Sequence, residues 1–505
     1  MSNQVRVRFA PSPTGGLHLG GVRTVLYNYL YARKHNGKFI LRIEDTDQSR
    51  LVAGAEQYIY DCLDWCGLTP NESPKHGGLY APYKQSERKE YGIYQQYANE
   101  LVANGHAYLA FDTTAELEAM RQAYKTDANP SPQYDASIRM HMKNSLSLSH
   151  EAVEALLQAK TPYVVRIKMP TDETITLTDM IRGQIQFDSN LIDDKVLLKQ
   201  DGMPTYHLAV VVDDYKMQIT HAFRGEEWLP SAPVHVMLWH YLFGTNAMPL
   251  WAHLPLILGP NGKLSKRDGA TYGFPVFAMD WVDNGELIKG FREMGFLPQA
   301  FINLLAVLGW NDGTEQEIYT EAELIESFSI EKVHHSGAKF DYEKAKWYNH
   351  EWIKKLDNAY LAKTLCSYAP TVYNHLDPMK LAIIIGLVKE RCHLLPDFWE
   401  QTKYFYTAPT TWQLDAIQPK WSAEKKEFFE QLVMVMHNIE VWDTTTIEAA
   451  FKNLANEKNI KLGELQLPLR IMLVGGKYGP SVMDIASLIG KQDTTQRITN
   501  LLAIL

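Results

Sequence analysis

The first twenty residues contain the pattern that most limits the fold of this chain. Apolar residues alternate with arginines from Val5 to Phe9, and a cluster of Pro, Ser, Thr and Gly follows before helical periodicity begins near Val22. The pattern predicts a strand, a tight loop and a helix, with the N–H groups of the helix start facing the space above the sheet. Such a helix start binds anions. His18 adds a side-chain donor beside it.

A second strand is expected over residues 38–45, after a helix over residues 22–35. Together with the first strand they form a βαβ unit, which binds ligands outside the carboxyl ends of its strands. Ser12 and Glu44 both fall at such ends. The sequence therefore predicts a polar site at this edge of a parallel sheet.

The remaining periodicities predict several domains, since 505 residues exceed the usual size of a single core. The expected fold is an α/β N-terminal half, a Rossmann-type parallel sheet with an inserted α+β domain, followed by an all-α C-terminal half in an elongated, multidomain molecule. The predicted domain ranges are 1–106, 107–200, 201–270, 271–330 and 331–505. We expect helices over residues 53–66, 87–104, 115–124 and 231–243, strands over residues 163–169, 175–187, 210–212 and 219–224, and almost only helices from Phe274 onward.

Composition limits the environment and the partners. The net charge is −9, and residues 351–505 are balanced with 17 basic and 17 acidic residues, so the acidic excess lies in the first 350 residues. A local basic face for nucleic acid is therefore allowed in the C-terminal part. No charged-then-apolar leader and no apolar run of about 18 residues is present, and we expect a cytoplasmic protein. The four cysteines are too few and too scattered for a disulfide framework.

A Gly-bounded basic loop at residues 259–269 carries Lys263 and Lys266. Taken alone, each of these segments has a simpler explanation. The basic loop is typical of a solvated turn, and the segment around His18 is typical of a helix-capping loop. Glu44 is typical of a strand end that faces water. Their order along the chain favours a common function: first the strand–loop–helix, then a carboxylate at the neighbouring strand end, then a lysine loop after the second α/β half.

These segments resemble the class I aminoacyl-tRNA synthetases in their glutamyl form. Residues 8–15 with 18–21 are similar to the first signature of that class, and residues 263–267 are similar to the second, the KMSKS loop. Gly21 stands in place of the second histidine, and Leu264 and Arg267 replace a Met and a Ser. Further similarity covers the whole chain, at residues 42–47, 83–88, 204–207, 212–214, 224–227, 461–463 and 468–470.

The resemblance implies roles for individual residues. Glutamate has two carboxylates and an ammonium group, so its site needs guanidinium groups and a carboxylate. Val210 stands where some relatives have Asn. The implied glutamate contacts are Arg8, Ala10, Ser12, Glu44, Tyr206 and Arg224. The implied ATP contacts are His18, Gly20, Glu227, Ile257, Lys263 and Lys266, of which His18, Lys263 and Lys266 are the catalytic residues. Arg391 corresponds to an arginine that reads the third anticodon base.

The implied reaction is the ATP-dependent ligation of glutamate to tRNA-Glu, with Mg²⁺ carried by ATP. The resemblance also implies that the enzyme is a monomer. The implied domain roles are catalysis for residues 1–106 and 201–270, binding of the acceptor end for 107–200, contact with the tRNA stem for 271–330, and binding of the anticodon for 331–505.

Several alternatives are weighed against this interpretation. One is a glutamyl enzyme that also charges tRNA-Gln. Glutaminyl-tRNA synthetase has a β-barrel anticodon module, whereas residues 330–505 are predicted to be helical. A small nucleotidyltransferase, or the short enzyme that glutamylates queuosine, leaves the second half unexplained. A non-enzymatic RNA-binding protein has no need of Lys266 on a Gly-rich loop.

The last prediction from the sequence concerns zinc. Some bacterial relatives bind zinc in the inserted domain through a Cys-x-Cys pair, but Ala110 and Asp112 stand at the corresponding positions. Without thiolates we expect no zinc site there. Metal analysis of the purified protein should find far less than one zinc per chain, and a stoichiometric amount would contradict the prediction.

Overall fold

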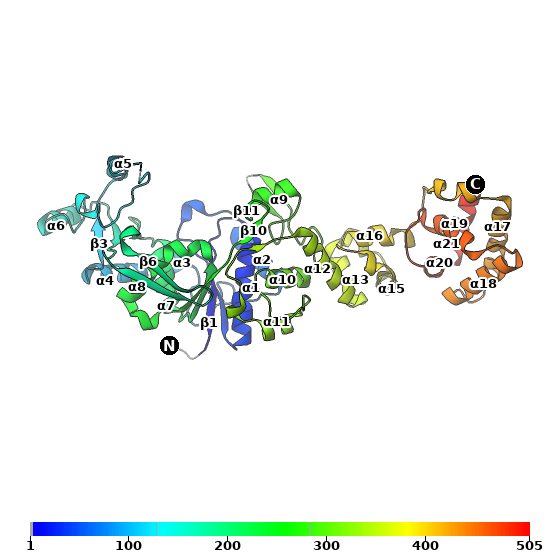
Figure 1. The fold of residues 1–505 in the computed structure, drawn as a ribbon, viewed down its shortest axis with the longest axis horizontal. Helices are drawn as coiled ribbons and strands as arrows, with labels where there is room; N and C mark the ends of the chain where they lie inside the picture. The colour runs from blue at the N-terminus through cyan, green and yellow to red at the C-terminus, as the bar shows by residue number, and fades with distance from the viewer. Residues whose placement is uncertain (1–3, 128, 284) are drawn as a thin grey trace. The chain divides into compact units, whose positions relative to one another are not determined.

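The computed structural model describes residues 4–127, 129–283 and 285–505 and divides them into two compact units. The first unit comprises the chain up to Arg292 together with Pro298–Tyr342, and the second comprises Glu293–Leu297 and Glu343–Leu505. Figure 1 shows mixed α/β structure in the first and helices in the second. The predicted order of an α/β N-terminal half and a helical C-terminal half is confirmed. No helix of the described ranges is long and apolar enough to cross a membrane.

The first unit is built on a six-stranded sheet. Its strands, in spatial order, are β2 (Lys38–Leu41), β1 (Arg6–Phe9), β8 (His221–Gly225), β9 (Leu250–Leu254), β5 (Thr174–Asp179) and β6 (Gly183–Asp188). The first five are parallel, and β6 pairs antiparallel with β5. The strand order reverses between β1 and β8. A crevice for ligands is therefore expected at the carboxyl ends of these two strands.

Part of the segment predicted to be the inserted domain belongs to this sheet. Within residues 107–200, the β5–β6 hairpin extends the sheet through the pairing of Asp179 with Trp251 of β9. The rest of that range contains a separate sheet of β3 (Ala107–Ala110), β4 (Val164–Ile167) and β7 (Val196–Leu198), with α5 (Thr114–Ala123) and α6 (His150–Gln158). Residues 107–200 therefore contribute two strands to the six-stranded sheet.

The helix α1 (Leu19–Lys34) follows β1, as the first residues predict, and packs on β1, β2 and β8. After β2 comes α2 (Ala55–Cys66). The single helix expected over residues 87–104 is two helices, α3 (Gln85–Lys89) and α4 (Ile93–Ala103). The break lies at Gly92, whose φ of 70° ends a helical path and suits glycine.

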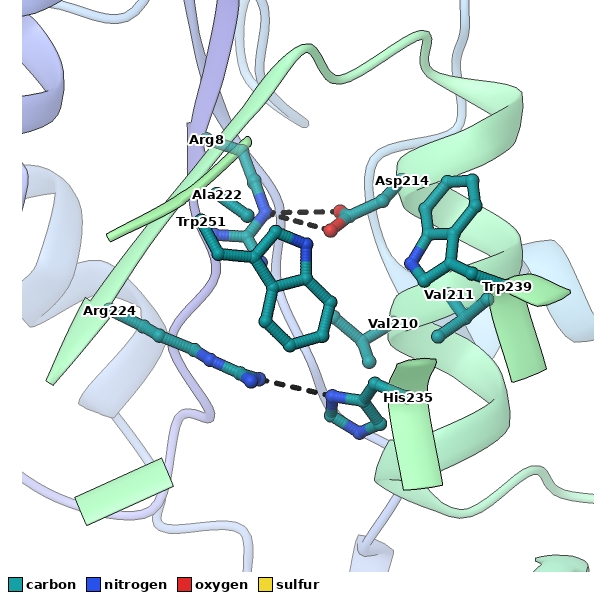
Figure 2. Close-up of a pocket in the computed structure, with 9 residues that line it drawn as sticks. All are labelled: Arg8, Val210, Val211, Asp214, Ala222, Arg224, His235, Trp239 and Trp251. Atoms are coloured by element: carbon teal, nitrogen blue, oxygen red, sulfur yellow. Dashed lines mark hydrogen bonds and ion pairs between the residues drawn. The ribbon is translucent and has the colours of Figure 1, made fainter. Parts of the chain in front are cut away.

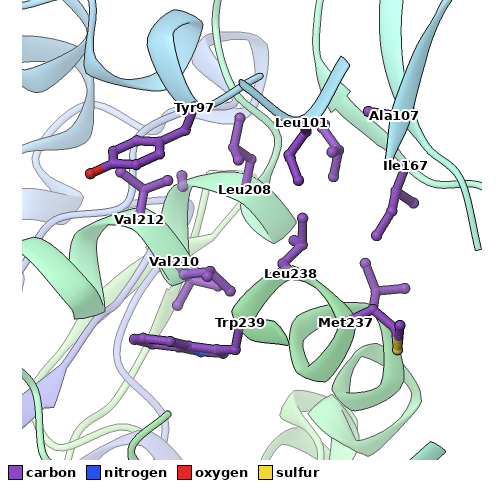
Figure 3. Close-up of a cluster of buried hydrophobic side chains, with 14 of the residues drawn as sticks. Tyr97, Leu101, Ala107, Ile167, Leu208, Val210, Val212, Met237, Leu238 and Trp239 are labelled. Carbon is purple, nitrogen blue, oxygen red and sulfur yellow. The ribbon is translucent and has the colours of Figure 1, made fainter. Parts of the chain in front are cut away.

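The strand predicted over residues 210–212 is wrong. Val210 and Val212 lie in α7 (Tyr206–Lys216), and Figure 3 shows them packed between α4 and α8 (Ala232–Phe243). Because every face of this part of α7 is buried, its sequence is a continuous apolar run. Such a run does not distinguish a buried strand from a buried helix.

The basic loop after the sheet folds as a short hairpin followed by a helix. The strands β10 (Ile257–Gly259) and β11 (Gly262–Lys263) pair antiparallel, β14 (Ala338–Lys339) joins β10, and α9 (Lys266–Tyr272) follows. Beyond Phe274 the chain is not purely helical, because β12 (Trp281–Asp283) and β13 (Glu286–Ile288) pair before α10 (Pro298–Val307) and α11 (Glu321–Ser327).

The second unit is helical. In it α13 packs on α14 and α15, α15 packs on α16, α17 packs on α18 and α21, and α19 packs on α20 and α21. Its helices are α12 (Tyr342–Lys355, whose first residue belongs to the first unit), α13 (Asn358–Tyr368), α14 (Pro370–Tyr373), α15 (Pro378–Val388), α16 (Asp397–Thr402), α17 (Ala423–His437), α18 (Thr444–Glu457), α19 (Leu462–Val474), α20 (Val482–Ile489) and α21 (Lys491–Leu502).

Candidate active site

A cavity of about 990 Å³ opens at the carboxyl ends of β1, β2 and β8. Most of the residues predicted for the site line this cavity. Those that line it are Arg8, Ala10, Ser12, His18, Gly20, Glu44, Tyr206, Arg224, Glu227, Ile257 and Lys263.

One wall of the cavity is the start of α1. His18 is the N-cap residue of α1. The centre of its ring lies 4.4 Å from the ring centre of Phe277, and this contact holds the His18 ring against the wall. A side chain added at Gly20 would meet no atom within 4 Å, so the backbone there faces open space. The first turn of α1 contains no acidic residue. This wall combines a helix N-terminus with a histidine and is suited to phosphate groups.

Two residues that line the cavity, Arg8 and Glu44, belong to a chain of buried ion pairs. Nε of Arg8 lies 3.0 and 3.1 Å from the two carboxylate oxygens of Asp214. Nη1 of Arg42 lies 2.7 Å from Asp214, and its Nη2 lies 2.9 Å from Oε1 of Glu44. Burial alone would lower the pKa of Arg42, but Asp214 and Glu44 raise it. Burial raises the pKa of Glu44, and Arg42 opposes that shift.

A third carboxylate, that of Asp213, belongs to the same chain of ion pairs. Asp213 accepts hydrogen bonds from Nε of Arg88 at 2.6 Å, from Gln85 at 2.8 Å and from the hydroxyl of Tyr94 at 2.9 Å. It also lies 3.9 Å from Nε of Arg42. Three guanidinium groups and three carboxylates thus share one buried network with no net charge. Its members are Arg8, Arg42, Arg88, Glu44, Asp213 and Asp214.

Arg224 differs from these arginines because its partners are neutral, and Figure 2 shows its contact with one of them, His235. Its Nε donates to Nε2 of His253 at 2.9 Å, and its Nη1 lies 3.0 Å from the hydroxyl of Tyr206 and 3.1 Å from Nδ1 of His235. The guanidinium lies 4.6 Å from the ring centre of Trp251. Nη2 is buried without a hydrogen-bond partner, and no ion pair of the described residues includes Arg224. The cavity therefore contains a cation that lacks a counter-ion.

The lysine loop also borders the cavity, through Lys263 and Leu264. Lys263 ends β11 and is exposed, while the side chain of Lys266 lies outside the described residues. Ser265 caps α9, since its N–H and its hydroxyl each donate to Oδ2 of Asp268 at 2.8 Å. The cap places Lys266 as the first residue of α9.

Two predicted features lie outside the cavity. Arg391 ends a 3-10 turn, Lys389–Arg391, after α15, where it is exposed and its Nη1 donates to the carbonyl of Leu387 at 3.1 Å. Asp112 accepts a hydrogen bond from the hydroxyl of Tyr134 at 3.0 Å and another from the backbone of Lys143 at 2.7 Å. Within the described ranges, no group of three or more His, Cys, Asp and Glu side chains could hold a metal ion.

The residues beneath the cavity are not identified by the sequence. Arg42, Asp213 and Asp214 belong to segments with family resemblance, but their pattern alone predicts no role for them. Their signal is a charged residue inside an apolar run, which is costly unless the charge is paired. His235 and His253 gave no comparable signal, because a single histidine in an apolar segment is common.

Two family models together cover nearly the whole chain. Residues 4–347 match the model described as "tRNA synthetases class I (E and Q), catalytic domain", and residues 342–502 match the model described as "Anticodon binding domain". The chain is 48% identical to a protein named glutamate–tRNA ligase from Amoebophilus asiaticus, over all of this chain and 99% of the relative. It is 47% identical to the protein of that name from Flavobacterium psychrophilum, over the full length of both.

Two solved structures that are similar to this chain carry names of the same kind. A crystal structure of a glutamate tRNA ligase from Elizabethkingia meningosepticum in complex with its amino acid has a TM-score of 0.93 and 44% identity, with both chains fully covered. The glutamate-tRNA synthetase from Elizabethkingia anophelis has a TM-score of 0.90 and 44% identity, over 99% of this chain and all of that one.

The site generates a prediction about pH. Burial lowers the pKa of His207 and His221 to about 4, and it lowers the pKa of His235 and His253 as well. These rings stay neutral in the folded state but bind protons near pH 6.5 once unfolded. Their contribution to stability is thus complete above pH 6.5 and is lost as the pH falls from 6.5 toward 4. Each histidine lowers the free energy of unfolding by up to about 1.4 kcal/mol per pH unit in that window.

Urea unfolding at pH 7.5 and 5.5 measures this effect. We expect His221→Asn to make the pH dependence shallower, whereas His437→Asn, which removes an exposed histidine, should leave it unchanged. Equal slopes for wild type and His221→Asn would contradict the prediction.

Proposed function

This chain belongs to the glutamate–tRNA ligases, a family of ATP-dependent class I aminoacyl-tRNA synthetases, and we propose that its cavity binds glutamate and ATP side by side. In this family glutamate is joined to ATP to form glutamyl-adenylate and is then transferred to the terminal adenosine of tRNA-Glu. The observation that best supports the proposal is the buried, uncompensated guanidinium of Arg224 in the cavity wall.

We propose that glutamate lies over the chain of ion pairs. Arg224 supplies the charge that a carboxylate needs, and its neutral partners leave that charge available. The carboxylate of Glu44 suits the ammonium group, while Arg8, Ala10, Ser12 and Tyr206 complete the contacts. A neutral amide in place of the substrate carboxylate would leave Arg224 buried without a counter-ion, at a cost of several kcal/mol. This cost favours glutamate over glutamine.

ATP is assigned to the other half of the cavity. His18 and the backbone at Gly20 face the phosphates, and Glu227 and Ile257 face the adenosine. In the first step a carboxylate oxygen of glutamate attacks the α-phosphorus, and the bond to pyrophosphate breaks. Charge grows on the phosphate oxygens, so the chain contributes positioning and a hydrogen-bond donor from His18 and positive charge from Lys263 and Lys266. Mg²⁺ enters with ATP as part of the substrate.

In the second step a ribose hydroxyl of tRNA attacks the carbonyl carbon of the mixed anhydride, and AMP leaves. For the other domains we propose the roles given above: residues 107–200 at the acceptor end, 271–330 on the stem and 331–505 at the anticodon. The match of residues 342–502 to an anticodon-binding model supports the last of these. We propose a monomer that acts in the cytoplasm, as the resemblance implies.

The lysine loop generates the first test of this function. Lys266→Ala removes a positive charge from the loop, and we expect kcat for tRNA charging to fall on the order of 10²-fold or more, the scale for one lost electrostatic group. Lys75→Ala, which removes an exposed lysine paired with Asp64, serves as the control and should charge tRNA-Glu normally. A near-normal rate for Lys266→Ala would contradict the assigned role.

Arg391 generates the second test. Its guanidinium is exposed in the 3-10 turn after α15, where it can reach a base. An arginine distinguishes a base that offers a carbonyl from one that offers donors. We expect Arg391→Gln to reduce the preference between tRNA-Glu and tRNA-Gln by roughly 1–3 kcal/mol, without affecting a minihelix that lacks the anticodon arm. The measurement is kcat/KM for both tRNAs, and it also decides whether tRNA-Gln is charged. An unchanged ratio would mean that Arg391 is only a solvated helix end.

A further inference from the structure

The hydrogen bonds of Arg224 determine the protonation of two histidines. A guanidinium group only donates, so both ring nitrogens that face Arg224, Nε2 of His253 and Nδ1 of His235, must accept. The remaining nitrogen of His235 then donates to Nδ1 of His207 at 3.1 Å. Arg224 is therefore held by neutral imidazoles of known tautomer.

His253 is itself held by one carboxylate. Its Nδ1 lies 2.6 Å from Oδ2 of Asp179, which also accepts the backbone N–H of His253 at 3.0 Å. The other oxygen of Asp179 accepts the N–H groups of Ile181 at 2.9 Å and Arg182 at 3.0 Å. His253 is 0% exposed and Asp179 is 2% exposed, so water does not compete for these bonds. The pair leaves His253 one orientation, with Nε2 toward Arg224.

We propose that Asp179 and His253 are positioning residues that hold Arg224 for the substrate carboxylate without neutralising its charge, an inference that rests on the proposed role of Arg224. A carboxylate in place of His253 would hold the guanidinium equally well but would compensate it, as Asp214 does for Arg8. A neutral ring that accepts at Nε2 gives orientation alone. The negative charge of Asp179 lies on the other side of the His253 ring from Arg224, where it selects the tautomer of His253.

The position of Asp179 in the chain links the Asp179–His253 pair to the inserted segment. Asp179 is the last residue of β5, in the hairpin that the inserted segment adds to the sheet. Arg182, in the same turn, donates to the carbonyl of His253 at 3.2 Å and pairs with Glu226 beside β8. The orientation of Arg224 thus depends on how the hairpin is seated. A change in the inserted segment that moves this turn should change the KM for glutamate.

Two substitutions of His253 separate its two hydrogen bonds. His253→Gln keeps an acceptor at the distance of Nε2, toward Arg224, and loses the donor to Asp179. His253→Asn keeps a donor at the distance of Nδ1, toward Asp179, and loses the acceptor for Arg224. Because a hydrogen bond to a charged group is removed, we expect His253→Asn to raise the KM for glutamate about tenfold or more, with the KM for ATP unchanged.

The selectivity for glutamate over glutamine, measured as the ratio of the two kcat/KM values at saturating ATP and tRNA-Glu, should fall about tenfold or more in His253→Asn and less in His253→Gln. This ratio does not depend on the fraction of enzyme that is folded, so it remains valid if the variants are unstable. His221→Asn removes a buried histidine of β8 that contacts Tyr31 and Thr220 instead, and it should leave the ratio unchanged.

Arg224→Gln distinguishes the two levels of the proposal. If it leaves the selectivity unchanged, the proposed role of Arg224 itself fails. If Arg224→Gln lowers the selectivity while His253→Asn and His253→Gln both retain it, only the positioning role fails. Equal losses in the two His253 variants, or a parallel rise in the KM values for glutamate and ATP, would also overturn the positioning role, because either result indicates a general structural effect.

Discussion

Six buried charges beneath the cavity are the constraint on which the catalytic unit depends. Arg42 lies between Glu44, Asp213 and Asp214, and its side chain is fully buried. Removal of one member would leave an uncompensated charge in the interior, which costs about 3–5 kcal/mol in measured cases. The network joins β1, the end of β2, α3 and α7, so it determines how these elements meet. It also brings Arg8 and Glu44, two of the residues proposed to contact glutamate, to the same edge of the sheet.

The same network divides the arginines of the cavity into two kinds. Arg8 is paired with Asp214, so its charge is largely satisfied before any ligand binds. Arg224 is surrounded by His235, His253 and Tyr206, all neutral donors or acceptors. Both are guanidinium groups in one pocket, but of the two only Arg224 lacks a carboxylate partner. On the proposed role of Arg224, specificity for an acidic substrate depends on the partners of each arginine rather than on the number of arginines in the pocket.

Much of the fold and many residues of the candidate site could be predicted from the sequence, because the features that indicate them are local. The strand–loop–helix around His18 and the acidic strand end at Glu44 follow from periodicity and turn residues within about forty positions. The helix α7 could not be identified in this way, since its buried valines have the composition of a strand. Partners such as Asp179 and His253 are far apart in sequence and meet only through strand pairing, so no spacing rule connects them.

The β5–β6 hairpin shows why the inserted segment cannot be an independent module. An insertion attached only through flexible linkers would leave the central sheet complete without it. Here β5 covers the edge of β9, which would otherwise expose unpaired backbone groups, and its last residue reaches under the pocket. The hairpin is therefore needed both to complete the sheet and to orient His253. Sequence changes in the rest of the segment are free to alter its outer surface, but the turn from Asp179 to Arg182 is restricted by the site it supports.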